Sequence, residues 1–65
     1  MVKTYIWLET DGIISGDLKK WDLKDFRKAY RHIESRIRKA LATGKHVNGA
    51  EIRLNDVIIW EYDGE

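Results

Sequence analysis

Cysteine and proline are both absent from this 65-residue chain. Without cysteine there is no disulfide framework, thiolate metal cage or thiol nucleophile, and a cytoplasmic setting is favoured. Long apolar runs are missing too, since the run from Val57 to Trp60 is far too short to cross a membrane. The N-terminal residues lead directly into an alternating pattern and show no signal-peptide signature. We therefore expect a cytoplasmic protein with no membrane partner.

The composition is that of a folded domain, with 43% hydrophobic and 35% charged residues. A chain this short allows one domain, residues 1–65, with a small core. The net charge of +1 conceals an uneven distribution, because residues 22–45 carry a basic excess and residues 46–65 an acidic one. We expect the basic residues to steer a partner, and the alternative is that the acidic end balances them within the molecule or across a dimer.

Two hairpin signals flank the middle of the chain. Residues 2–9 are rich in β-branched and aromatic side chains and precede the turn signal Asp11-Gly12, which predicts a strand and a hairpin. Residues 13–15 would form a short return strand that Gly16-Asp17 ends, although this strand is left open.

In the second half, Asn48-Gly49 is the strongest two-residue hairpin signal and predicts a turn between residues 46–47 and 50–52. A second turn at residues 54–56 would then lead to a strand over 57–62.

The middle segment has the spacing of an amphipathic helix from residue 22 to 43. Asp22 is a candidate N-cap, and Gly44 supplies the stop. The apolar positions of this helix are Leu23, Phe26, Tyr30, Ile33, Ile37, Ala40 and Leu41. Hairpin, helix and hairpin together predict an α+β fold, a small antiparallel sheet with one long helix packed on one face. Which face the helix covers is left open.

Two surpluses of apolar surface point to an oligomer. The predicted helix would be about 33 Å long, whereas strands of five to eight residues span about 17 to 27 Å. The strands are also apolar on both faces; Ile58, Trp60 and Tyr62, for example, would point one way and Val57 and Ile59 the other. Half-exposed aromatic residues in a monomer are the alternative. We expect a homo-oligomer, with a dimer favoured, whose interface includes Tyr5, Trp7, Ile37, Leu41, Trp60 and Tyr62.

Basic residues gather on one arc of the predicted helix, beside its apolar stripe. Lys24, Arg31 and Arg38 recur every seven residues and form one line. The candidate partner-binding or phosphate-binding residues of this arc are Lys24, Arg27, Lys28, Arg31 and Arg38. A face exposed only to solvent is the alternative interpretation.

No pattern of a catalytic, cofactor or metal site stands out. His32 and His46 are not at metal-ligand spacing, and neither is paired with a carboxylate in a recognisable motif. The aspartates of the first half are typical of turns and helix caps. We therefore expect a protein that is not an enzyme and holds no cofactor.

The second half of the chain carries a resemblance. Residues 40–45 (ALATGK), Asn48-Gly49, residues 54–57 (LNDV) and the aromatic strand that follows look like small uncharacterised proteins encoded by phages and prophages of Gram-positive bacteria. The resemblance implies an accessory protein that binds and blocks a host macromolecule in the host cytoplasm, as an anti-defence or host-takeover inhibitor. The alternative is a nucleic-acid-binding accessory or regulatory protein that uses the basic helix face. The sequence leaves the identity of the partner open.

Overall fold

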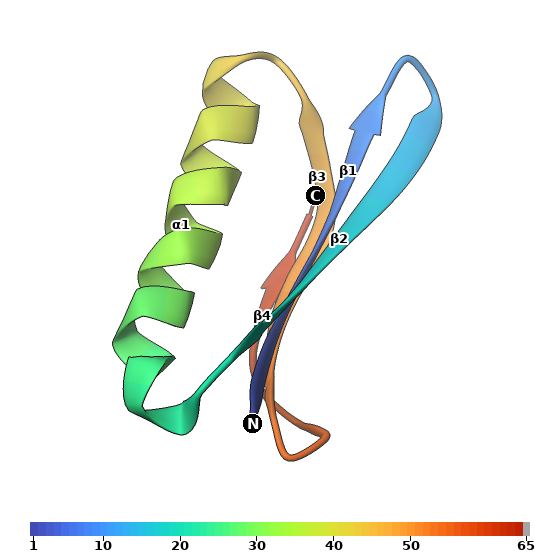
Figure 1. Ribbon diagram of the computed structural model, residues 1–65. Coiled ribbons are helices and arrows are strands. Elements are labelled where there is room, and N and C mark those ends of the chain that lie inside the picture. The colour runs from blue at the N-terminus through green and yellow to red at the C-terminus, as the bar shows by residue number, and fades with distance from the viewer. Residues whose placement is uncertain (65) are drawn as a thin grey trace.

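The computed structural model describes residues 1–64 and shows a four-stranded antiparallel sheet with a long helix against one face (Figure 1). The elements are β1 (Val2–Thr10), β2 (Ile13–Trp21), a 3-10 turn (Leu23–Asp25), α1 (Phe26–Ala42), β3 (His46–Leu54) and β4 (Val57–Asp63). The strands lie in the order β2-β1-β3-β4, so the two hairpins join where β1 pairs with β3. The predicted α+β class is confirmed.

Both hairpins turn through two residues in the left-handed conformation. Asp11 and Gly12 have φ angles of 53° and 81°, and Asn55 and Asp56 have φ angles of 50° and 67°. Positive φ at both central residues is the geometry of a type I′ turn, whose twist matches that of the paired strands. The turns predicted at Asp11-Gly12 and at residues 54–56 are confirmed.

Asn48 and Gly49 lie inside β3, so the hairpin predicted at this pair is wrong. Trp7 pairs with Gly49 whereas Leu8 pairs with Val47, which makes Asn48 the extra residue of a β-bulge. Neither Asn48 nor Gly49 has the positive φ of a type I′ turn. A bulge here lets β3 continue along β1, whereas a turn would have left half of β1 without this partner.

β2 is longer than predicted. It was expected to end at Ser15, but it continues for nine residues to Trp21. Gly16 pairs with Trp7 and the pairing continues past Asp17 without a break, because β1 offers hydrogen-bonding groups along its whole length. The prediction that Gly16-Asp17 breaks the strand is therefore wrong.

The helix begins and ends close to the predicted bounds. Asp22 occupies the N-cap of the 3-10 turn, but its side chain makes no capping hydrogen bond. At the other end Gly44 has a φ of 78°. The Lys45 amide donates to the Ala40 carbonyl at 2.9 Å and the Gly44 amide donates to Leu41 at 3.2 Å, which is a Schellman motif. No helix in residues 1–64 combines the length and the apolar character needed to cross a bilayer.

The core lies between α1 and the central strands β1 and β3 (Figure 1). The face that α1 covers is the face of Ile6, and not that of Tyr5 and Trp7. The buried apolar residues are Val2, Ile6, Ala29, Ile33, Ile37, Ala40, Val47, Ala50 and Ile52. Leu23 and Leu41, the two ends of the predicted stripe, remain 60% and 55% exposed.

The helix and the sheet are about equally long, so the predicted excess of helix length over strand length is wrong. β1, β2 and β3 have nine residues each, which corresponds to about 30 Å. α1 has 17 residues, or about 26 Å, and the 3-10 turn brings the total to about 32 Å. An excess of helix length was expected because the strands were predicted to be shorter than they are.

Candidate functional site

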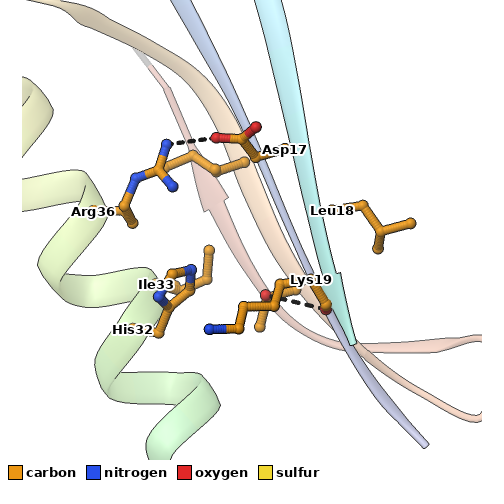
Figure 2. A pocket seen from close by; sticks show the side chains of 8 residues that line it. Asp17, Leu18, Lys19, His32, Ile33 and Arg36 are labelled. Carbon is orange, nitrogen blue, oxygen red and sulfur yellow. Dashed lines mark hydrogen bonds and ion pairs between the residues drawn. The ribbon is translucent and has the colours of Figure 1, made fainter. Parts of the chain in front are cut away.

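The sheet face that α1 leaves uncovered carries an apolar patch over β1 and β2. Tyr5 and Trp7 of β1 stack on each other there, with ring centroids 5.8 Å apart and planes 11° from parallel. Ile14 and Leu18 of β2 lie on the same face and are 58% and 51% exposed. Figure 2 shows Leu18 pointing away from the helix side of β2. We call Tyr5, Trp7, Ile14 and Leu18 the open-face patch.

Two glycines support the position of Trp7. Gly16 of β2 and Gly49 of β3 are its partners across the neighbouring strands. A Cβ on Gly16 would lie 3.0 Å from Cδ1 and Nε1 of the indole, and a Cβ on Gly49 would lie 3.8 Å from Cε3. The indole therefore lies against the β2 backbone, where the absence of a side chain leaves room for it.

Towards β3 the open face becomes charged. The Arg53 guanidinium lies 4.8 Å from the Tyr5 ring centroid, and its Nε donates a hydrogen bond to the Glu51 carboxylate. That hydrogen bond raises the pKa of Arg53. An apolar area beside a charged rim is the arrangement found in protein interfaces.

A bulge in β4 changes which side chains share this face. The register against β3 shifts so that Ile58 pairs with Arg53 and Ile59 is the extra residue. Trp60 and Tyr62 consequently face the helix side, whereas Ile58 lies on the open face. The prediction that Ile58, Trp60 and Tyr62 point the same way is wrong.

A groove of about 170 Å³ lies between α1 and β4. It is lined by Tyr30, Glu34, Ile37, Arg38, Trp60 and Tyr62. The Tyr30 and Trp60 rings meet edge to face at a centroid distance of 5.7 Å. This contact uses apolar surface that the sequence assigned to an interface.

The six predicted interface residues do not form one surface. Tyr5 and Trp7 belong to the open-face patch, whereas Ile37, Trp60 and Tyr62 line the α1–β4 groove on the other side of the sheet, and Leu41 is exposed near the end of α1. An oligomer can use at most part of this set at any one contact.

The basic helix face is exposed along α1 and the 3-10 turn before it. It consists of Lys24, Arg27, Lys28, Arg31 and Arg38. Lys28 lies 3.8 Å from Asp25 and Arg38 lies 3.9 Å from Glu34. In the described part of the chain, Lys24, Arg27 and Arg31 make no ion pair within 4.0 Å. Three neighbouring cations are therefore available to an anionic partner.

A further groove, which the sequence did not indicate, lies between α1 and β2 (Figure 2). Its volume is about 240 Å³, and Arg36 closes one end with a 2.6 Å ion pair to Asp17. Lys19 and His32 line the same groove. The groove was missed because β2 was predicted to end before Asp17. The spacing of Asp17, Lys19 and Trp21 at every second residue was the signal that could have revealed it.

Polar contacts organise the groove. The Trp21 indole Nε1 donates to the Thr4 hydroxyl at 3.1 Å, and that hydroxyl donates to the Lys19 carbonyl at 3.4 Å. Lys19 also lies 4.3 Å from the Trp21 ring centroid. Burial, followed by the charges of Lys19 and Arg36, lowers the pKa of His32. The arrangement offers neighbouring charges of both signs rather than an activated nucleophile.

Within residues 1–64, no group of three or more His, Cys, Asp or Glu side chains is placed to hold a metal ion. The chain matches no protein-family model, and comparisons with curated proteins and with solved structures also find no match.

Proposed function

We propose that this chain is a small non-enzymatic interaction protein that binds and blocks another macromolecule. In this proposal it acts in the cytoplasm as a homo-oligomer, in the manner of phage or mobile-element accessory proteins that inhibit a host protein. The observation that carries the proposal is the open-face patch. It combines half-buried aromatic rings with exposed aliphatic side chains and has charged residues beside it, and no element of the chain described in residues 1–64 covers it.

The position of Trp7 supports a role in binding a protein. Its ring is stacked on Tyr5 and lies against the backbone at Gly16, so little side-chain entropy remains to be lost on binding. Rigid aromatic residues of this kind are common anchors of protein interfaces. The basic helix face would contribute mainly to the rate and orientation of association.

A capture experiment with substituted proteins tests the proposal. The immobilised protein is exposed to a lysate of a Gram-positive bacterium, and bound proteins are identified for wild type and for Trp7→Ser. Leu23→Ser is the matched control, because Leu23 is an exposed apolar residue at the start of the helix, away from the patch.

A target retained by wild type and by Leu23→Ser but lost with Trp7→Ser is the expected result. Circular dichroism establishes that the substituted proteins remain folded. A target retained equally by Trp7→Ser would contradict the role of the patch. If no target binds above background, the proposal fails for that host.

The exposed cations Lys24, Arg27 and Arg31 favour nucleic-acid binding as a second candidate function. Phosphate contacts by such residues release counterions, so affinity should fall steeply between about 50 and 200 mM salt. Fluorescent single- and double-stranded nucleic acids are titrated with wild type and with the Arg27→Glu, Arg31→Glu double variant. Binding that weakens for all sequences in the variant would support this function. Absence of binding at low salt would exclude it.

A further inference from the structure

The outer edge of β2 is an unpaired strand of nine residues. β2 pairs only with β1, and α1 packs over β1 and β3, so no element in residues 1–64 lies along that edge. In Figure 1, β2 begins at the hairpin with β1, far from α1, and its other end leads into the helix. Unpaired strand edges readily accept a further strand.

The turn geometry indicates which backbone groups are available on this edge. Thr10 and Ile13 flank a two-residue turn and therefore form a hydrogen-bonded pair. Because antiparallel pairs alternate, the amides and carbonyls that point away from β1 belong to every second residue. These residues are Ile14, Gly16, Leu18 and Lys20.

Two of the three charged residues of β2 are arranged symmetrically about Leu18, and the third, Lys20, lies on the open face and would face Gly16 of the other copy. Asp17 and Lys19 flank Leu18, and both point to the helix side, where they line the groove of Figure 2. Two copies of β2 that pair antiparallel with Leu18 opposite Leu18 place Asp17 of each copy opposite Lys19 of the other. Opposite charges across a strand pair are favourable.

The neighbouring registers lack this complementarity. A shift of one residue towards the N-terminus places Asp17 opposite its own copy, and a shift towards the C-terminus places Lys19 opposite its own copy. Like charges directly opposite each other are unfavourable. The other sheet edge, β4, is also a poor site for self-pairing, because its charged side chains, Glu61 and Asp63, are both acidic.

We infer that the protein forms a two-fold symmetric dimer through β2, with the dyad at Leu18 and paired Asp17–Lys19 contacts on either side. The two sheets become one eight-stranded sheet, and the two open-face patches meet across the dyad. This inference gives a specific contact to the homo-oligomer of the proposed function. It does not depend on the identity of the target.

Single-cysteine variants test the register, because the chain has no cysteine of its own. Leu18→Cys meets its own copy at the dyad. Cα atoms of a hydrogen-bonded antiparallel pair lie about 5.5 Å apart, within the range that a disulfide spans. Ile14→Cys is the matched control on the same strand and face with similar exposure. Its two copies would lie about 27 Å apart in this dimer.

Under mild oxidation, Leu18→Cys should form a covalent dimer of twice 7.7 kDa, and Ile14→Cys should remain monomeric. Equal cross-linking of the two variants would overturn the register. A wild-type mass of 7.7 kDa at every concentration in sedimentation equilibrium would overturn the dimer.

A charge exchange provides the second test. Lys19→Glu places two carboxylates opposite each other and should weaken dimerisation about tenfold. The Asp17→Lys, Lys19→Glu exchange should restore it. Lys19→Glu removes the Lys19–Trp21 contact, and the exchanged protein lacks both that contact and the Asp17–Arg36 ion pair. Recovery by the exchanged protein must therefore come from pairing between copies. Failure of the exchange to restore the dimer would contradict the proposed pairing. A monomer that still captures a target through Trp7 would overturn only this inference and not the proposed function.

Discussion

Ile33 is the residue on which the contact between helix and sheet most depends. It is fully buried between α1 and the central strands. Truncation to alanine removes buried methyl and methylene groups and leaves a cavity, so Ile33→Ala should lower the free energy of unfolding by about 2 to 5 kcal/mol. Urea denaturation followed by circular dichroism measures the change.

Leu41→Ala provides the comparison. Leu41 lies on the same helix but is 55% exposed, so the substitution should cost less than about 1 kcal/mol. Equal costs for the two substitutions would contradict the orientation of α1.

His32 should make stability depend on pH. Burial and the charges of Lys19 and Arg36 lower its pKa in the folded protein, outweighing the opposite effect of Asp17. The unfolded chain therefore binds a proton more readily than the folded one as pH falls through about 6.5. Stability should decrease over that range and level off below the pKa of the folded state. Denaturation of wild type and His32→Gln across this pH range checks the effect. An unchanged pH dependence in His32→Gln would assign it to other groups.

At the scale of elements, a substitution in the turn of the second hairpin should stabilise the protein. Asp56 has a φ of 67°, a conformation that glycine adopts without steric cost. Its ion pair with Lys3 is long, at 3.7 Å, and exposed, so the side chain contributes little. Asp56→Gly creates the preferred Asn-Gly type I′ turn and should raise the free energy of unfolding by about 0.5 to 1 kcal/mol.

A substitution in the turn of the first hairpin should instead destabilise the protein. Gly12 has a φ of 81°, and Gly12→Ala should destabilise the protein by about 1 kcal/mol because alanine is strained there. Thermal melts of the two variants should shift in opposite directions. A lower melting temperature for Asp56→Gly would contradict the type I′ assignment.

At the scale of the whole molecule, assembly should be linked to stability. The proposed dimer binds only folded chains, so mass action stabilises the folded state as concentration rises. The melting temperature of wild type should increase with protein concentration, whereas that of Lys19→Glu should change much less. Calorimetry over a wide concentration range measures both. A wild-type melting temperature independent of concentration would contradict the dimer.

Local signals in the sequence determined the order of the elements, the bounds of the helix and the two hairpin turns at residues 11–12 and 54–56. Helical periodicity identified Ile33 and Ile37 as core residues because a helix makes its hydrogen bonds within itself. Asp11-Gly12 was predictable because turn chemistry depends on adjacent residues. The exposure of the basic helix face followed from the same periodicity.

The tertiary structure alone decided the lengths of the strands, their bulges and the surfaces they build. β1 pairs along its length on both sides, so β3 continues through a bulge at Asn48-Gly49 and β2 continues through Gly16-Asp17. The residues next to these pairs in the sequence do not encode that pairing. One extra residue in β4 moved Ile58 to the face opposite Trp60. Each of these outcomes depends on residues far apart in the chain. The open-face patch and the α1–β2 groove therefore became visible only when the strands were paired.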